Sequence, residues 1–379
     1  MAPQGGVSIL LLAVVVGGAS AAAAGGASAA AAGGASAAAA GGGSPDGSSG
    51  FSSVFVAGAG GYACYRIPAL LRLPNATLLA FAEGRRFSCA DHGWNDIVQR
   101  SSHDGGATWG ALSVVYGESS RTLNVTIGNP APAVLSADGR SLLMPFCREN
   151  REVGLAGSED GGSSWSLAQR SIAVPPGTWT TWVATGPPGS VRLEGSGRIV
   201  VAMNFANATV KAASAALLSD DGGATWRLSA GIVRGGNENQ VVQLPWRAPA
   251  GQMLHMTMRN AAGGSRLASE STDGGESWAA PWQTVGPEDA CEGSVVALPS
   301  ARRLAMSNAF DRTKRLNMTV HVSGDDGRHW APAALVWPGP SAYSSVVDAS
   351  AGGGDLVGLL FEKGDKGPYE QIAYVSVPL

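Results

Sequence analysis

The octamer SHDGGATW at residues 102–109 recurs four times further along the chain, and this repeat decides the fold. The copies are SEDGGSSW from Ser158, SDDGGATW from Ser219, STDGGESW from Ser271 and SGDDGRHW from Ser323, with successive starts 56, 61, 52 and 52 residues apart. The Asp and Gly of each copy are typical of a tight hairpin turn, in which the carboxylate accepts backbone N–H groups. The Trp is expected to pack under that turn. Chance Asp-Gly hairpins would not place Trp in register five times.

A second repeat consists of six short apolar stretches, each of which follows turn residues. They are TLLAFAEG from Thr77, SLLMPFC from Ser141, RIVVAMNF from Arg198, QMLHMTMRN from Gln252, RLAMSNAF from Arg303 and DLVGLLFEKG from Asp355. The first five each precede an octamer by roughly twenty residues. Nearly continuous apolar character predicts strands that are buried on both faces and end at a polar rim.

Six units over residues 51–379 give about 55 residues per unit, which is close to a four-stranded propeller blade with long loops. We therefore predict an all-β fold, a six-bladed β-propeller. After the sixth stretch no octamer follows, so N-terminal residues are expected to complete the last blade and close the ring. A two-sheet sandwich would not explain six similar periods.

The N-terminal part of the chain differs in composition from this body. The first 45 residues contain no charged side chain, and the apolar run VSILLLAVVV at residues 7–16 has the length of a signal-peptide core. Residues 1–21 are interpreted as a signal peptide. Residues 22–50, rich in Ala and Gly with repeated GGASAAAA, cannot bury enough surface to offset their ordering entropy and are interpreted as a spacer.

Glycosylation sequons and cysteines bear on the compartment. Four N-x-T sequons, at Asn75, Asn124, Asn207 and Asn317, together with the leader favour the secretory pathway. We expect a lysosomal or secreted protein. As an alternative, the leader could be retained and anchor the protein in a membrane. The four cysteines (Cys64, Cys89, Cys147 and Cys291) could form disulfides in three pairings or stay as buried thiols.

Composition and motifs exclude several classes of function. The 29 acidic and 26 basic residues give a net charge of -3, without the excess positive field that attracts nucleic acids. The five His are scattered and the Cys and His lack metal-site spacing, while no phosphate-binding glycine motif follows a strand. The sequence thus gives no sign of a nucleic-acid partner, a metal or a nucleotide cofactor.

Polar residues cluster at the expected ends of strands from different units, where a propeller would bring them into one funnel. They are Arg66 in YRIP, Glu83, Arg85 and Asp91 after the first apolar stretch, Glu238, Arg259, Arg315, Tyr343 in WPGPSAYSS, and Glu362. A cluster of permanently charged guanidinium groups is the expected receptor for a carboxylate.

YRIP, the five octamers, FAEGRRFSCAD, RLNMTV, WPGPSAYSS and FEKG together resemble the exo-α-sialidases, or neuraminidases, most closely the animal lysosomal sialidase. In that family the octamers are called Asp boxes. The resemblance implies that the protein hydrolyses terminal α-linked sialic acids on glycoproteins, oligosaccharides and gangliosides, with no cofactor. It also implies a lysosomal carrier protein as a partner, because related lysosomal sialidases work in a complex with a serine carboxypeptidase.

The resemblance also implies a role for each matching residue. Arg66, Arg259 and Arg315 would grip the sialic acid carboxylate, Arg85 would lie beside them, and Glu362 would orient Arg66. Tyr343 would be the nucleophile, Glu238 its partner and Asp91 the acid/base. A neutral phenol suits this substrate, because a carboxylate nucleophile would be repelled by the carboxylate on the anomeric carbon.

Two alternatives use the same fold. A non-catalytic Asp-box propeller could act as a lectin or sorting module, although this would not explain Tyr343 together with three arginines. A propeller glycosidase for neutral sugars would need two catalytic carboxylates and no arginine triad. The segment from Asn150 to Trp182 matches nothing in the family pattern, so the wall that contacts the glycerol and N-acetyl groups stays unassigned.

Overall fold

The computed structural model describes residues 50–379, except residues 176, 180, 249–250, 287–290 and 351–354. All regular structure in this part of the chain is β: 25 strands are present, and none of the described residues forms a helix that could cross a membrane. The predicted signal peptide, and the predicted spacer except for residue 50, lie outside the described residues.

The strands form antiparallel sheets along the chain. The first sheet contains β2 (Cys64–Arg72), β3 (Leu78–Arg85), β4 (Asn95–Ser102) and β5 (Ser113–Tyr116). The second contains β6 (Ile127–Gly128), β7 (Ala133–Val134), β8 (Leu142–Arg148), β9 (Glu152–Ser158) and β10 (Ser166–Gln169). The third contains β11 (Trp182–Arg192), β12 (Ile199–Ala206), β13 (Ala213–Ser219), β14 (Arg227–Leu228) and β15 (Val233–Arg234).

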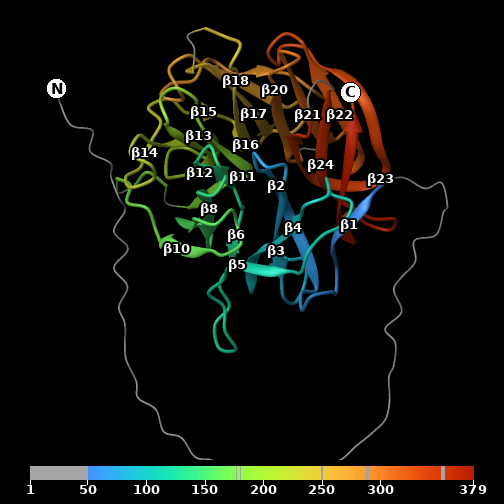
Figure 1. Ribbon diagram of the computed structural model, residues 1–379. Helices are drawn as coiled ribbons and strands as arrows, with labels where there is room; N and C mark the ends of the chain where they lie inside the picture. The colour runs from blue at the N-terminus through green and yellow to red at the C-terminus, as the bar shows by residue number, and fades with distance from the viewer. Residues whose placement is uncertain (1–49, 176, 180, 249–250, 287–290, 351–354) are drawn as a thin grey trace, which may run out of the picture. The chain divides into compact units, whose positions relative to one another are not determined.

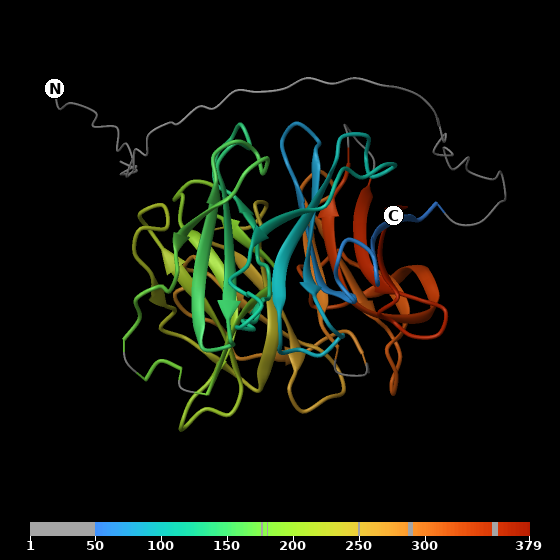
Figure 2. The ribbon, with the colours of Figure 1, turned by 90° about the horizontal axis from the view of Figure 1, so that it is seen from below.

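Two further sheets complete the described part of the chain. The fourth contains β16 (Gly236–Gln243), β17 (Leu254–Asn260), β18 (Leu267–Ser271) and β19 (Trp282–Gln283). The fifth has seven strands: β20 (Gly293–Leu298), β21 (Arg303–Ala309), β22 (Leu316–Ser323), β23 (Ala331–Asp348), β24 (Leu356–Lys363), β25 (Gln371–Pro378) and the N-terminal β1 (Ser52–Val56). Both ribbon views place the N-terminal strands, in blue, between the green sheets and the red C-terminal sheet (Figures 1 and 2).

The all-β, propeller-like arrangement agrees with the prediction, but the number of separate sheets does not. Hydrogen bonding joins the described strands into five sheets rather than six, because β23 is one continuous strand that serves two units. Its first part, residues 331–340, pairs with β22, and its last part, residues 341–348, pairs with β24. Sequence periodicity identifies repeat units and is insensitive to whether the last strand of one unit runs without a break into the next.

The predicted closure of the ring by N-terminal residues is confirmed. β1 pairs antiparallel with β25, with Ser52 opposite Tyr374 and Val56 opposite Gln371. Phe55 in β1 is 1% exposed, and its ring lies 5.2 Å from that of Tyr65 in the first sheet. The two ends of the folded body are therefore held together by strand pairing and by core packing.

Five of the six apolar stretches lie second from one end of their sheet, as β3, β8, β12, β17 or β21, and the sixth, β24, lies inside the seven-stranded sheet between β23 and β25. Their side chains are buried almost throughout, as predicted. The strands that contact one another at the centre are different ones: β2 contacts β11 and β23, and β16 contacts β11 and β20. Hydrophobic clusters lie between neighbouring sheets. The two halves of the seven-stranded sheet also pack on each other, because Val320 of β22 and Leu359 of β24 belong to one cluster.

Each octamer forms a hairpin turn after the third strand of its unit. In the third sheet, Asp221 accepts hydrogen bonds from the backbone N–H and hydroxyl of Thr225 and from the hydroxyl of Ser219, at 2.9, 2.6 and 2.8 Å. Gly223 adopts a φ of 94°, which only glycine reaches without strain. Trp226 is buried beside the turn, while the other four octamer tryptophans are half-buried.

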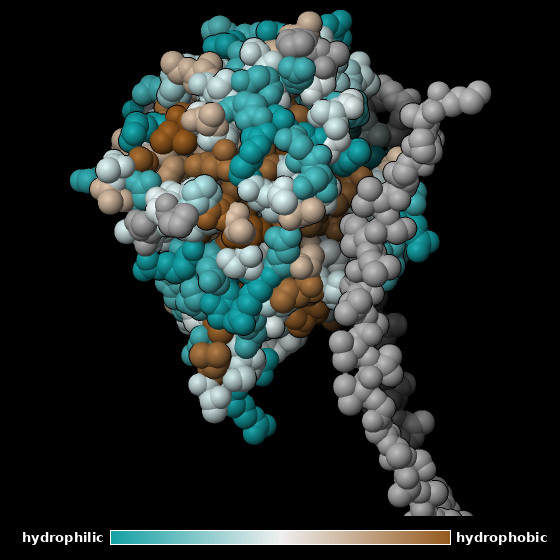
Figure 3. All heavy atoms as spheres, turned by 90° about the vertical axis from the view of Figure 1, so that its left-hand side faces the viewer, coloured by the Kyte–Doolittle hydropathy of each residue, from teal (hydrophilic) through white to brown (hydrophobic). Residues whose placement is uncertain are grey.

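The outer surface mixes hydrophilic and apolar residues on the side shown in Figure 3. The large hydrophobic side chains that are exposed among the described residues are scattered over several elements: Val56, Phe87, Val114, Leu123, Leu167, Trp182 and Leu335. Two of them belong to the surroundings of the candidate site, because Phe87 lies on the loop that carries Asp91 and Trp182 lines the cavity described below.

Candidate active site

A phenol, a carboxylate and a guanidinium meet where the fourth sheet and the seven-stranded sheet approach each other. Tyr343 on β23 donates its hydroxyl to Glu238 Oε1 on β16 at 2.5 Å. Arg259, near the end of β17, donates from Nη1 to Glu238 Oε2 at 2.9 Å and to the Tyr343 hydroxyl at 3.3 Å. Residues that lie 21, 84 and 105 positions apart in the sequence thus form one hydrogen-bonded cluster.

Arg66 is fixed on the other side of this phenol by a buried carboxylate. Glu362 on β24 is fully buried and accepts from Arg66 Nε at 2.7 Å and from the Ile67 N–H at 2.9 Å, while its second oxygen accepts the Tyr343 N–H at 3.0 Å. Ile67 has a φ of 57°, a strained value for a β-branched residue, and the register of β2 against β3 shifts just after Arg66. The local strain and the bulge coincide with the point where Arg66 leaves the sheet.

Arg315 completes the ring of positive charge. It lies directly before β22 and donates from Nη1 to the Tyr369 hydroxyl at 2.8 Å. Its guanidinium carbon is 5.5 Å from the centre of the Tyr343 ring, and that of Arg66 is 5.0 Å away. The Arg66 guanidinium also lies over the Tyr369 ring, at 4.0 Å. Three guanidinium groups therefore surround one phenol.

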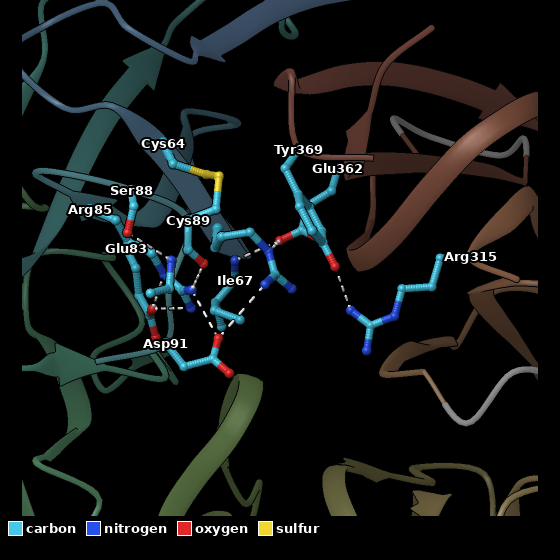
Figure 4. The surroundings of a disulfide bond; sticks show 12 residues. Cys64, Ile67, Glu83, Arg85, Ser88, Cys89, Asp91, Arg315, Glu362 and Tyr369 are labelled. Atoms are coloured by element: carbon cyan, nitrogen blue, oxygen red, sulfur yellow. Dashed lines mark hydrogen bonds and ion pairs between the residues drawn. A yellow bond between two sulfur atoms is a disulfide. The ribbon is translucent and has the colours of Figure 1, made fainter. Parts of the chain in front are cut away.

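Asp91 and Arg85 form the neighbouring part of the site, shown in Figure 4. Arg85 at the end of β3 is buried and donates from Nη1 to Asp91 Oδ1 at 2.9 Å and from Nη2 to Glu83 Oε2 at 2.7 Å. Asp91 lies in the loop after β3, with its side chain 75% exposed, and its Oδ1 is 3.9 Å from Arg66 Nη1. Its carboxylate is thus open to solvent on one side and faces two arginines on the other.

The environment keeps the Tyr343 phenol protonated. Burial raises the pKa of Tyr343 well above its usual value, and the adjacent Glu238 carboxylate raises it further, while Arg259 and Arg66 act in the opposite direction. A neutral phenol of this kind becomes a nucleophile only when a neighbouring base accepts its proton in the reaction. The carboxylate that receives its hydrogen bond is in position for that role.

Burial and the neighbouring arginines have opposite effects on the pKa of Asp91. Partial burial raises its pKa, but the hydrogen bond and positive charge of Arg85, together with the charge of Arg66, outweigh burial and hold the pKa below its usual value. The carboxylate is therefore ionised near neutral pH, and anything that neutralises these arginines would raise its pKa.

One cavity is lined by residues from both parts of the site, although the three arginines around Tyr343 are not among them. It is lined by Ile67, Glu83, Arg85, Asp91, Thr126, Gly128, Asn129, Cys147, Asn150, Trp182, Glu238 and Tyr343. A separate hollow of about 410 Å³, lined by residues such as Leu70, Val241 and Val346, contains none of the predicted site residues. Within the described residues, no group of three His, Cys, Asp or Glu side chains is arranged to hold a metal ion.

The structure brings together all eight predicted site residues, and it adds neighbours that the sequence did not reveal. Tyr369, the acceptor for Arg315, comes from a turn before β25 that carries no motif. Trp182, at the edge of the segment left unassigned, lines the cavity. Glu292 is buried at 1% exposure and accepts the Ser344 N–H at 2.8 Å, next to Tyr343. Nothing in the sequence around these three residues distinguishes them.

The cysteines combine the two possibilities that the sequence left open, a disulfide and buried thiols. Cys64 and Cys89 form a disulfide, whereas Cys147 and Cys291 are buried thiols. The disulfide links the first residue of β2 to the loop that carries Asp91.

Comparison with known proteins places this fold and site among described families. Residues 76–357 match the model of the BNR repeat-like domain. A sialidase from Micromonospora viridifaciens is 30% identical over 342 residues, covering 82% of this chain and 51% of the relative, so the chain spans about half of that protein. Sialidase-3 of Mus musculus is 28% identical over 394 residues, covering 82% of this chain and 90% of the relative.

Solved structures show the same fold at lower identity. Hadza microbial sialidase Hz136 superposes with a TM-score of 0.74 at 22% identity, covering 87% of this chain and 68% of that one. A Trypanosoma rangeli sialidase, solved with 2,3-difluorosialic acid as a covalent intermediate, gives 0.70 at 18% identity, covering 86% and 59%.

Fold and site together define a propeller-like β protein with an arginine-lined site around a buried tyrosine. The match to the BNR repeat-like family extends over most of the chain. The chain belongs to the sialidase family of BNR repeat-like proteins.

Proposed function

We propose that the protein is an exo-α-sialidase that hydrolyses terminal α-linked sialic acids with retention of configuration. The observation that carries this proposal is the group of three guanidiniums, from Arg66, Arg259 and Arg315, around a buried phenol that is hydrogen-bonded to a carboxylate. Such a group suits a substrate whose carboxylate is attached to the carbon under attack.

In this proposal the positive charges of the arginines bind the carboxylate of the substrate. Arg66 is held by Glu362 and Arg315 by the Tyr369 hydroxyl, so neither guanidinium has to be ordered when the substrate enters. Preorganised donors cost little reorganisation when the carboxylate arrives. The substrate carboxylate would also neutralise part of the positive charge near Asp91, which would raise the pKa of Asp91 toward a value suited to proton donation.

In the first chemical step the Tyr343 oxygen attacks the anomeric carbon while its proton passes to Glu238. The bond to the leaving oxygen breaks, and Asp91 gives that oxygen a proton. In the second step Asp91 accepts a proton from water and the water oxygen attacks the anomeric carbon. The bond between that carbon and the Tyr343 oxygen breaks, and this oxygen recovers its proton from Glu238. Two inversions give net retention, and both carboxyl groups return to their starting state.

The test is a sialoside hydrolysis assay between about pH 4 and 7, where carboxyl groups titrate. We expect release of sialic acid by the wild type, whereas Tyr343→Phe should lose about 10³-fold or more in kcat, about 4 kcal/mol of transition-state stabilisation. The variant should still bind an unsaturated sialic acid analogue. As a matched control, Tyr374→Phe, whose hydroxyl interacts with Ser376, should remain active.

A trapping experiment distinguishes the enzyme from a lectin. Incubation with 2,3-difluorosialic acid should add one sugar mass to the peptide that contains Tyr343, and none to that peptide in Tyr343→Phe. Binding of the analogue by the wild type without hydrolysis or adduct would support the non-catalytic lectin or sorting module.

We also propose that sialylated glycoproteins, oligosaccharides and gangliosides are the substrates, and that the protein acts in the lysosome or after secretion. A disulfide and exposed sequon asparagines, Asn75 and Asn124, support passage through the secretory pathway. A lysosomal carrier protein stays a proposal based on family resemblance.

We further propose that the seven-stranded sheet works as two adjoining blades. If β23 is divided between residues 340 and 341, each half of the sheet has four strands. One half consists of β20, β21, β22 and the first part of β23, and the other consists of the second part of β23, β24, β25 and β1. The cluster that contains Val320 and Leu359 packs the two halves together, as other clusters do between separate sheets. Both observations support a count of six blades.

A further inference from the structure

We propose that the Cys64–Cys89 disulfide is a positioning cross-link that holds the loop carrying Asp91 against the arginines of the site. The inference rests on the proposed sialidase function, because it assigns the cross-link to the acid/base step. Figure 4 shows the disulfide on one side of this loop and the contacts of Asp91 on the other.

Apart from the disulfide, the loop is anchored by side-chain hydrogen bonds from Arg85 and Asn95 and by a ring contact between Phe87 and Trp94. β3 and β4 are paired up to Arg85 and Asn95, and the Arg86 N–H donates to the Trp94 carbonyl at 2.9 Å. Beyond these residues the run from Arg86 to His92 is exposed, with Cys89 as its half-buried member, and Phe87 is 68% exposed. An exposed run of this length has considerable conformational freedom unless a contact near its centre restrains it.

The cross-link joins two short segments that each end in a site residue. Cys64 lies two residues before Arg66 on β2, and Cys89 lies two residues before Asp91. Cys64 pairs in regular register with Arg85, and Arg66 with Glu83, so the side chains of Cys64 and Arg66 project from the same face of β2. The disulfide therefore brings the loop to the face from which Arg66 projects.

Hydrogen bonds then set the last part of the geometry. Arg85 Nη1 donates to the Cys89 carbonyl at 2.6 Å and to Asp91 Oδ1 at 2.9 Å, and Asn95 Nδ2 donates to the Asp91 carbonyl at 3.0 Å. These bonds depend on Cys89 staying near the end of β3, where Cys64 is 0% exposed. Without the cross-link, Asp91 would sample positions away from the glycosidic oxygen, while the carboxylate-binding arginines would stay on their strands.

The test is the double variant Cys64→Ser/Cys89→Ser, assayed with two sialosides that differ in leaving group. Sialyllactose has a poor leaving group that needs protonation, whereas an aryl sialoside has a good one that needs little. General acid catalysis contributes about 10²–10⁴-fold, so we expect kcat/KM for sialyllactose to fall about tenfold or more, and for the aryl sialoside less than about threefold. Affinity for the unsaturated sialic acid analogue should be unchanged within about twofold.

A double-mutant cycle with Asp91→Asn shows whether the effect acts through Asp91. Loss of the cross-link should cost nothing further in kcat/KM once Asp91 has been replaced. Equal losses for both substrates, or the same loss in the Asp91→Asn background, would overturn the inference.

If the double variant does not fold, the same test can be made by reducing the disulfide in the folded wild type. Treatment with a phosphine reductant, followed by thiol alkylation mapped by mass spectrometry, should produce the same dependence on leaving group, and reoxidation should reverse it. Full activity toward sialyllactose with both Cys64 and Cys89 alkylated would contradict the positioning role. A wild type that hydrolyses neither sialoside would overturn the proposed function and this inference with it, whereas an active wild type with uniform losses would overturn the inference alone.

Discussion

At the residue scale, Arg315 differs from Arg66 and Arg259 because its hydrogen bond goes to a phenol and not to a carboxylate. It donates to the Tyr369 hydroxyl and lies beside the Tyr343 ring. Neither of these neighbours is a carboxylate, so the charge of Arg315 stays available for a substrate carboxylate, whereas Arg66 and Arg259 already contact Glu362 and Glu238. Arg315 should therefore contribute to substrate binding more than to the arrangement of the protein.

Replacement of Arg315 by Ala should raise KM for a sialoside about 10- to 100-fold with a smaller change in kcat. A hydrogen bond to a charged group contributes about 1.5–3 kcal/mol, and this one would exist in the bound ground state and in the transition state alike. Steady-state kinetics separates the two parameters. The exposed Arg312, three residues earlier, provides the control, and Arg312→Ala should behave like the wild type. Unaltered KM and kcat in Arg315→Ala would remove this residue from the site.

Arg85 tunes the proton affinity of Asp91. It lowers the Asp91 pKa, against the effect of partial burial. A general acid is active while protonated, so activity falls as pH rises through its pKa. Arg85→Gln removes the lowering influence, and the alkaline limb of the kcat/KM profile should therefore move to higher pH. A limb that stays in place would show that another group controls it.

At the element scale, the octamer turns are stabilised by ionised aspartates. Hydrogen bonds from Thr225 and Ser219 lower the pKa of Asp221 to about 2. A folded-state pKa below the unfolded value, about 3.9, means that the carboxylate stabilises the fold fully above about pH 4 and loses this effect as pH falls through about 2. The turn should thus retain its hydrogen bonds at mildly acidic pH.

Asp221→Asn imitates the protonated carboxyl group and tests this directly. The variant should melt at a lower temperature than the wild type at pH 6, and the two melting temperatures should converge toward pH 2. Thermal unfolding followed by circular dichroism across this range provides the measurement. A constant difference at every pH would mean that shape, and not charge, accounts for the role of Asp221.

At the scale of the whole molecule, stability depends on closure of the ring by β1. Phe55 inserts from this strand into a cluster shared with the first sheet. Phe55→Ala should lower the free energy of unfolding by about 3–5 kcal/mol, the usual cost of truncating a buried Phe. Val56→Ala on the same strand is the control, since Val56 is 45% exposed. Denaturant unfolding measures both, and similar small losses would show that β1 does not hold the ring closed.

The sequence alone predicted much of the fold, because each repeat unit is encoded locally. An Asp-Gly turn followed by Trp, or an apolar stretch of strand length, can be recognised from about ten consecutive residues. The count of separate sheets was wrong, because the continuity of β23 depends on hydrogen bonding to β22 and β24 rather than on its own residues.

The candidate site also contains two kinds of residue, those that local sequence motifs predict and those that only the tertiary structure brings to the site. Arg66 in YRIP and Tyr343 in WPGPSAYSS stand in recognisable motifs, so the sequence predicted them, whereas the stretch around Glu238 matches the family pattern only loosely. Tyr369, Trp182 and Glu292 carry no such signal, and neither does the pairing of Cys64 with Cys89. Each of these depends on which side chains a closed ring brings within a few ångströms. That proximity is set by packing between sheets, because residues far apart in the chain meet only after the strands have paired and their apolar faces have been buried.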